Sequence, residues 1–316
     1  MKDDFSTTIG PMEELPTLTC PGCGSTLRGN RAGPAGSFLG CTRKCEPCGI
    51  AFSNATNRPT TIYRDPLMNI PVAARSGAQD IVQSALNVCN RPSKWSKFGF
   101  GTSEDALTWT VFSFLGSNPS AMRAAWTTLG GDSWSAFDPS QASILLWGTS
   151  LSPRPTSDEV ARQLIRVSDE LGEAPQSRSE PDVILDGGET GLIFIEVKYL
   201  SGNDLQIGHP HFAEYVDSEA FIDPAVSLQS GMYELARNWR IATEMAGDRP
   251  MSLVNLGQRA RLLRQQKSLE LFTDSLDQSR RWQFRLMDWR EFLESWRQHR
   301  PGWLTEYLRQ RISDVR

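Results

Sequence analysis

The residues best suited to chemistry lie between Glu180 and Tyr199, in the stretch EPDVILDGGETGLIFIEVKY. Two apolar runs, Val183–Leu185 and Leu192–Tyr199, flank a glycine-rich turn, which predicts a β-hairpin. Side chains alternate between the two faces of a strand, so Glu196 and Lys198 share one face at the end of the second strand. Folding the hairpin brings Asp182 back beside Glu196.

Two carboxylates at a strand end suit a hard cation such as Mg²⁺ or Mn²⁺, which prefers oxygen ligands. Such a cation can polarise a phosphoryl oxygen and lower the pKa of a bound water. Lys198 would orient that water or neutralise charge in the transition state. The alternative is a surface hairpin with an ordinary Glu–Lys pair. That alternative leaves unexplained why charges interrupt a run that otherwise looks buried on both faces.

Pro181-Asp182, thirteen intervening residues and then Glu196-Val197-Lys198 form a pattern that resembles the signature of the PD-(D/E)XK nuclease superfamily. The resemblance covers about residues 102–257. It implies a restriction-endonuclease-like α/β core with the order α-β-β-β-α-β, in which helices flank a mixed central sheet. It also implies that Asp182, Glu196 and Lys198 are the catalytic triad, and that Asp182 and Glu196 hold Mg²⁺ with help from the Val197 carbonyl.

The elements expected around the hairpin follow this order. Apolar periodicity, capping residues and breakers predict helices over 102–116, 117–130, 156–171 and 224–246, and strands over 142–148 and 251–256. The helix over 156–171 is an insertion relative to the minimal pattern. The helix over 224–246 contains Gln229 and Tyr233, four residues apart, which resembles the QxxxY motif of one branch of the superfamily. The resemblance implies that these two residues orient Lys198 or the phosphate.

Glu104 lies on the apolar face of the helix expected at 102–116, three residues before Leu107. An acid at the start of a helix can simply complement the helix dipole. It can also be the fourth acid that members of the superfamily often carry there, and thus a further Mg²⁺ ligand. Glu170 and Glu173 are rival candidates for that fourth acid, although each is expected at a solvated helix end.

Five of the six cysteines lie within residues 20–48. The pairs Cys20/Cys23 and Cys45/Cys48 are separated by twenty-one residues, a spacing that predicts a Cys₄ zinc site close to the zinc-ribbon pattern. Four thiolates leave zinc no open coordination position, so its role would be structural. Cys41 could replace Cys45, and reduced cysteines without metal are the alternative.

The composition limits the classes of protein. The chain has 316 residues, 39% hydrophobic content and a net charge of −4, so contacts with nucleic acid must come from a local basic patch. No apolar run is long enough to span a bilayer, and the N-terminus lacks the features of a secretory signal. The cytoplasm is the expected compartment. Arginines and tryptophans interleave after Arg280, either as a phosphate-contacting face or as a helix with buried tryptophans.

Three segments are therefore expected: a flexible lead and zinc module at 1–60, an irregular linker at 61–101, and a nuclease-like domain at 102–316 with an Arg/Trp-rich extension. The first functional hypothesis is a Mg²⁺-dependent enzyme that hydrolyses the phosphodiester bonds of DNA. Its setting would be restriction, repair or defence against foreign DNA. The enzyme could act with protein partners of such a system, and it could form an oligomer. The alternative is a non-catalytic DNA-binding or scaffold subunit on a nuclease-like fold.

Overall fold

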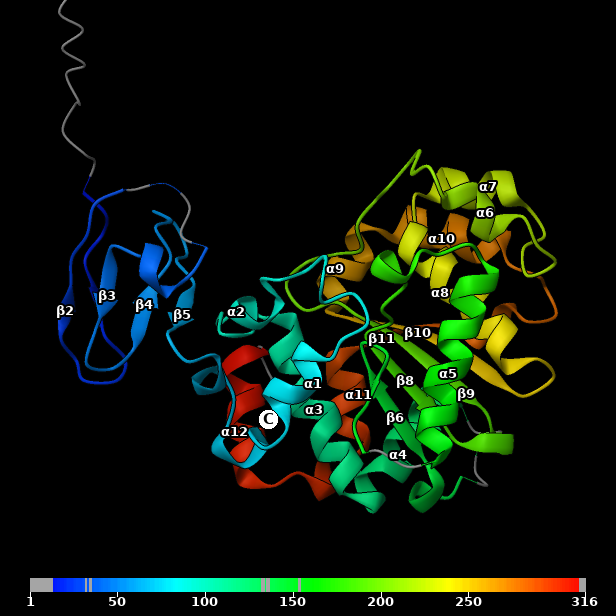
Figure 1. Cartoon of the computed structure of the whole chain (residues 1–316), viewed down its shortest axis with the longest axis horizontal. Coiled ribbons are helices and arrows are strands. Elements are labelled where there is room, and N and C mark those ends of the chain that lie inside the picture. The colour runs from blue at the N-terminus through cyan, green and yellow to red at the C-terminus, as the bar shows by residue number, and fades with distance from the viewer. Residues whose placement is uncertain are drawn as a thin grey trace, which may run out of the picture. The chain divides into compact units, whose positions relative to one another are not determined.

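The hairpin that carries Asp182, Glu196 and Lys198 lies inside a six-stranded mixed sheet (Figure 1). The structure is a computed structural model that describes residues 14–312 except 32, 34, 35, 132, 133, 135, 136, 153 and 154. The first thirteen residues, where the flexible lead was expected, lie outside the described residues. The strands of the sheet are β6 (Ser143–Leu146), β7 (Thr149–Ser150), β8 (Val183–Asp186), β9 (Leu192–Val197), β10 (Met251–Gly257) and β11 (Phe284–Asp288).

The order of strands across the sheet is β11-β10-β9-β8-β6-β7. Neighbours from β7 to β9 run antiparallel, whereas β9, β10 and β11 run parallel to one another. Every residue of β8, β9 and β10 is buried. Strands covered on both faces read as continuous apolar runs, and this is why LIFIEV and MSLVNLG are recognisable as central strands.

Helices cover both faces of this sheet. The helices of the larger unit are α1 (Ala78–Gln83), α3 (Glu104–Ser117), α4 (Pro119–Gly130), α5 (Pro155–Glu170), α6 (Phe212–Val216), α7 (Pro224–Ser230), α8 (Tyr233–Ala246), α9 (Arg259–Arg264), α10 (Gln266–Ser275), α11 (Trp289–Ser295) and α12 (Gly302–Arg311). Neighbouring residues of β10 show the two faces. Leu253 belongs to one buried cluster with Trp239 of α8, while the Ser252 hydroxyl donates to the Leu129 carbonyl of α4.

The predicted α/β class is therefore confirmed at the level of a mixed sheet flanked by helices. Helices α3, α4 and α5 and strands β6, β8, β9 and β10 lie where the sequence predicted them. The single helix expected over 224–246 is wrong in its middle. Gly231 has a left-handed backbone (φ +71°) and ends α7, and α8 begins at Tyr233.

The C-terminal part is not one amphipathic helix. It contains the edge strand β11, which the sequence analysis missed, and the short helices α11 and α12. Trp289 and Trp296 are fully buried, which bears out the reading of those tryptophans as core residues. Trp282, in contrast, is 58% exposed, and Arg281 and Arg297 pair with Asp274 and Glu294.

The cysteine-rich segment belongs to a second compact unit, made of the residues up to Asn69 together with 95–103. Its strands are β1 (Leu18–Thr19), β2 (Thr26–Leu27), β3 (Arg43–Cys45), β4 (Ile50–Phe52) and β5 (Thr61–Tyr63), and it includes all of helix α2 (Lys94–Phe98) but the first residue. The linker expected at 61–101 is thus shared between the units, since β5 joins the sheet β3-β4-β5 and residues 70–94 join the larger unit.

Buried Arg43 ties the loops of this smaller unit together. Its guanidinium donates to the carbonyls of Pro16, Ser53 and Ala55 at 2.9, 2.5 and 2.7 Å. Only small clusters of apolar residues accompany it, such as Phe38 with Ala51 and Ile62. A unit with so little apolar core needs further cross-linking, which the cysteines can provide through a metal.

Candidate active site and candidate zinc site

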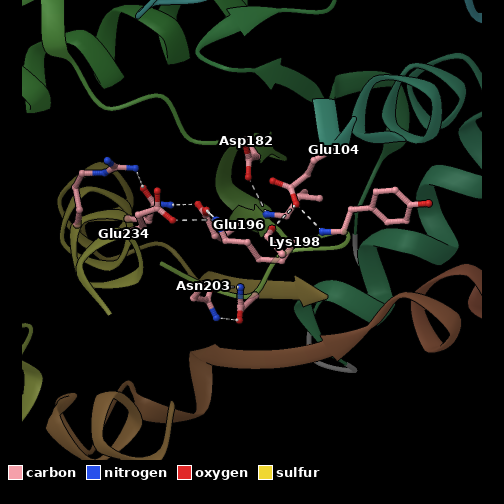
Figure 2. Close-up of polar contacts among 12 residues, drawn as sticks. Glu104, Asp182, Glu196, Lys198, Asn203 and Glu234 are labelled. Carbon is pink, nitrogen blue, oxygen red and sulfur yellow. Dashed lines mark hydrogen bonds and ion pairs between the residues drawn. The ribbon is translucent and has the colours of Figure 1, made fainter. Parts of the chain in front are cut away.

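The register of the hairpin sets Asp182 opposite Glu196. Strands β8 and β9 pair antiparallel with Val183 across from Ile195, so the residue before Val183 faces the residue after Ile195. Asp182 Oδ2 accepts a hydrogen bond from the Val197 amide at 2.9 Å, which fixes its carboxylate at the end of β9. The predicted meeting of the two acids is therefore seen in the structure (Figure 2).

Lys198 lies between two carboxylates. Its Nζ is 2.6 Å from Glu196 Oε1 and 2.9 Å from Glu234 Oε2. Glu196 and Lys198 are both buried, at 4% and 8% exposure. Like Leu192 and Phe194, Glu196 lies on the face of β9 that is covered by α8, because side chains two residues apart share a face. Glu196 and Lys198 thus follow the apolar residues Leu192 and Phe194 along this face of the strand. There the side chain of Glu234 reaches Lys198.

Glu104 reaches the same site from the first turn of α3. Its Oε2 accepts from the Tyr199 amide at 2.5 Å and from the Ser201 hydroxyl at 3.2 Å (Figure 2). The rival acids lie elsewhere: Glu170 pairs with Arg166 on the surface, and Glu173 binds Ser179 and the Tyr215 hydroxyl. Among the three candidates for a fourth acid, Glu104 is the one placed beside the triad.

The site strongly perturbs its acids. Burial, together with the charge of Glu196, raises the pKa of Asp182 well above its usual range. Burial likewise raises the pKa of Glu196, although Lys198 opposes the shift. Burial raises the pKa of Glu104 to about 7, against the opposing effect of Lys198. Carboxyls crowded together and shielded from water hold their protons more tightly, a pattern common at functional sites.

In this cluster the pKa of Lys198 is also raised, whereas the pKa of its second partner, Glu234, is lowered. Burial alone would lower the pKa of Lys198, but the surrounding carboxylates, first among them Glu196 and Glu234, raise it well above its usual range. Burial would raise the pKa of Glu234, yet Lys198 and Arg237 outweigh that effect and lower it. Lys198 therefore stays charged in this cluster, and its ammonium is the fixed positive centre of the site.

Helix α8 supplies two residues that the sequence analysis missed. Besides Glu234, it places Asn238 one turn later, whose amide donates to Glu196 Oε2 at 2.7 Å from a fully buried position. Both oxygens of Glu196 are thus hydrogen-bonded, one to Lys198 and one to Asn238. The available signal was a pair of polar residues four apart within a helix whose other inward positions are apolar.

Gln229 and Tyr233 lie apart from this network. Gln229 is exposed on α7, beyond the break at Gly231. Tyr233 is buried, and its ring stacks on His209 with the centroids 3.7 Å apart. In the part of the chain that the structure describes, no hydrogen bond or ion pair joins either residue to Lys198, Glu196 or Asp182.

A pair of buried amides supports the loop that follows β9. Asn203 and Asn255 exchange two hydrogen bonds, at 2.9 and 3.0 Å. Asn255 is directly across from Glu196 in the parallel pairing of β9 with β10. The Gln265 side chain then binds both the amide and the carbonyl of Asn203, at 2.7 and 2.6 Å. The chain leaving Lys198 is therefore held to β10 and to the start of α10.

The donor set of Asp182, Glu196 and Glu104 consists of carboxylate oxygens, the ligands that a hard cation prefers. Their oxygens do not all lie within 4.8 Å of one another, since among the described residues only the four cysteines form a group that close. Lys198 and Asn238 hold the two oxygens of Glu196. Asp182, Glu196 and Glu104 would supply the oxygen ligands if a hard cation bound here.

Cys20, Cys23, Cys45 and Cys48 converge in the smaller unit, with all four sulfurs within 4.8 Å of one another. The Sγ atoms of Cys23 and Cys45 are 3.6 Å apart, close to the ~3.8 Å edge of a tetrahedron built on Zn–S bonds of about 2.3 Å. Cys41 instead donates its thiol to the Ser37 carbonyl at 3.4 Å. The geometry thus selects Cys45 over Cys41, and the four cysteines could bind a metal such as zinc.

Backbone hydrogen bonds form the two cysteine turns. The Gly24 amide donates to the Cys20 carbonyl at 2.9 Å, and the Gly49 amide donates to the Glu46 carbonyl at 3.3 Å. Both glycines have a positive φ angle, +74° and +64°, which residues with a side chain rarely adopt. The glycine after each Cys-x-x-Cys motif therefore lets the chain turn back past the sulfurs.

Comparisons of the chain with models of known families, with curated proteins and with solved structures found no match. Over the residues that the structure describes, no helix has both the length and the apolar character needed to cross a lipid bilayer.

Proposed function

We propose that this chain is a metal-dependent nuclease that hydrolyses phosphodiester bonds of DNA. The observation that carries the proposal is the buried Glu196–Lys198 pair at the end of β9, with Asp182 set opposite by the strand register. Burying three charged groups together is costly unless they serve one another or a ligand. The order α3, β6, β8, β9, α8, β10 supports a restriction-endonuclease-like core around them.

Each residue would have a distinct task. Asp182 and Glu196 would hold Mg²⁺ or Mn²⁺, with Glu104 and the Val197 carbonyl as further ligands. The bound cation would supply an activated water and stabilise charge on the phosphate. Lys198, kept charged by its carboxylate neighbours, would bind the attacking water or a phosphoryl oxygen. Glu234 and Asn238 contact Lys198 and Glu196 directly, so we assign the orienting tasks to them instead of to Gln229 and Tyr233.

Zinc in the Cys₄ site would be structural, because four thiolates leave no position for substrate. The setting would be restriction, repair or defence against foreign DNA, with DNA as the partner of the larger unit. A non-catalytic DNA-binding subunit is the second candidate. Its supporting observation is that both oxygens of Glu196 are satisfied within the protein, as they would be in a purely structural ion pair.

The deciding experiment incubates the protein with plasmid and linear DNA in Mg²⁺, in Mn²⁺ and in EDTA. We expect cleavage in either metal, none in EDTA, and none from Asp182→Ala or Lys198→Ala. Asp158→Ala and Lys97→Ala are matched controls, because they remove the same charges from exposed positions. Cleavage by the two site variants at the wild-type rate would place the chemistry elsewhere. Metal-independent binding without cleavage would favour the second candidate.

A further inference from the structure

Helix α9 begins beside Lys198. Strand β10 runs parallel to β9 with Leu256 across from Val197, so both strands end at the same edge of the sheet. A Cβ atom placed on Gly257, the last residue of β10, would lie 3.6 Å from the Lys198 Cβ. Arg259 then starts α9 two residues later. Helix α9 therefore starts close to the edge of the sheet that carries Lys198.

The segment from α9 into α10 reads RARLLRQQK and carries cations without acidic partners. Arg264 and Lys267 are exposed and Arg261 is half-buried. No ion pair in the described part of the chain involves these three residues. In the C-terminal region, by contrast, Arg281, Arg297 and Arg309 pair with Asp274, Glu294 and Glu306. Three cations without an acidic partner thus follow the strand that pairs with β9.

Hydrogen bonds hold the segment from Arg259 to Lys267, called the strip below, close to the end of β9. Gln265 binds both backbone groups of Asn203, whose side chain pairs with Asn255 across from Glu196. Arg261 lies four residues before Gln265, one turn away on the same face, and Arg264 lies three residues after Arg261. At 1.5 Å per residue, the whole segment from Arg259 to Lys267 extends only about 12 Å. Its charges are therefore within reach of phosphates that flank a bond held at the site.

We propose that Arg261, Arg264 and Lys267 bind the phosphate backbone of the nucleic acid that the active site cleaves. This inference rests on the proposed nuclease function and names the surface that holds its substrate. Arginine forks match phosphate oxygens, and a chain of net charge −4 needs such a local patch to attract a polyanion. The contacts read the backbone and not the bases, so they add affinity to every sequence alike.

The test measures binding of fluorescently labelled duplex DNA, single-stranded DNA and duplex RNA to the full chain in EDTA over a series of KCl concentrations. The variant is Arg261→Gln/Arg264→Gln/Lys267→Gln. The control is Arg281→Gln/Arg297→Gln/Arg309→Gln, which removes the same charge from arginines that already have acidic partners. Circular dichroism checks that both proteins are folded. The plot of log K against log[KCl] has a negative slope of roughly 0.9 per phosphate contact. We expect the α9 variant, which loses three contacts, to make this slope less steep by about 3, and the control to keep the wild-type slope.

The outcomes separate this inference from the proposed function. A weaker salt dependence of DNA binding in the α9 variant, with the control unchanged, supports the inference. A weaker salt dependence for RNA alone overturns it, because the segment would then not hold the proposed substrate. Equal affinities and slopes for the α9 variant, the control and wild type overturn the strip, even if wild type cleaves DNA. Absence of any binding by wild type overturns it too. The proposed function is judged separately, by metal-dependent cleavage and its loss in Asp182→Ala.

Discussion

Asn238 shows how much of the site depends on one neutral side chain. It is fully buried and donates to Glu196 Oε2, while Lys198 holds the other oxygen. Glu196 therefore cannot rotate without leaving a buried donor unpaired, which costs about 1–3 kcal/mol. Mutation of a residue that orients a metal-binding carboxylate typically lowers metal affinity or activity by about 10–100-fold.

We expect Asn238→Ala to lower cleavage by about 10–100-fold, because Glu196 loses the donor that fixes its orientation. The free energy of unfolding should fall by about 1–3 kcal/mol, since the site is buried. Kinetics at saturating and at low Mg²⁺, with a thermal melt, measure both effects. Asn90→Ala, at an exposed position, is the control. Undiminished cleavage at low Mg²⁺ would show that Asn238 only packs the helix.

Glu104 makes the stability of the metal-free protein depend on pH. Its pKa in the folded protein is about 7, above the ~4.3 expected in the unfolded chain, so the folded state binds the extra proton. The sign follows from linkage: this contribution is complete below the unfolded pKa and is lost as the pH rises through about 7. In EDTA, the melting temperature of wild type should therefore fall between pH 5 and 8.

We expect Glu104→Gln to flatten this fall, because glutamine does not ionise, and to reduce cleavage strongly while the protein stays folded. Melting curves in EDTA across that pH range, together with a cleavage assay, make the measurement. Glu159→Gln, on the exposed side of α5, should keep the wild-type slope. If Glu104 only complements the helix dipole, cleavage will persist and stability will drop by about 0.3–1 kcal/mol.

At the scale of elements, the periodicity of apolar residues predicted those helices and strands whose burial shows in the local sequence. Strands β8, β9 and β10 were recognisable because burial on both faces makes them uniformly apolar, and α5 because Val160, Leu164 and Val167 repeat at helical spacing. Strand β11 was missed since FRLMD has only partial burial at the edge of the sheet. The polar pair Glu234 and Asn238 stood out by its spacing, but its partners could not be predicted, because they depend on which face of α8 packs on the sheet.

The break at Gly231 was missed for a related reason. The residues on either side have helical periodicity, and only the left-handed φ of Gly231 separates α7 from α8. That turn sets where α8 begins, and hence the reach of Glu234 to Lys198. A Cβ at Gly231 would also come within 3.0 Å of the Ile207 side chain and 3.6 Å of the Leu205 Cβ. The turn at Gly231 therefore packs against the loop that follows β9.

Gly231→Ala should destabilise the protein by about 1–2 kcal/mol, because a left-handed residue with a Cβ is strained. The larger unit should melt at a lower temperature, and cleavage should fall because α8 carries two residues of the site. Gly302→Ala is the control: it lies in the first turn of α12, where nothing is within 4 Å of a new Cβ. Equal melting temperatures for the two variants would show that the chain continues α7 into α8 without strain.

At the scale of the whole molecule, the chain divides into two units with different sources of stability. The larger unit buries a broad core that joins strands β6, β8, β9 and β10 to α5, α8 and α10. Among the described residues of the smaller unit, two small apolar clusters are present, and Cys20 and Cys45 belong to one of them. With so little apolar surface to bury, a metal held by the four cysteines would supply a large part of its folding free energy.

The purified protein should therefore contain about one Zn²⁺ per chain, lost in Cys20→Ser and in Cys48→Ser, because a closed thiolate site needs every ligand. Cys41→Ser should keep its zinc, since the Cys41 thiol binds the Ser37 carbonyl and not the cluster. Elemental analysis of freshly reduced protein measures the metal, and hydrogen exchange measures its effect on folding.

In Cys48→Ser, amides of the smaller unit should exchange rapidly while strands β8 to β10 stay protected, because the two units have separate cores. Zinc-free wild-type protein with a protected smaller unit would contradict both the metal site and its role in folding.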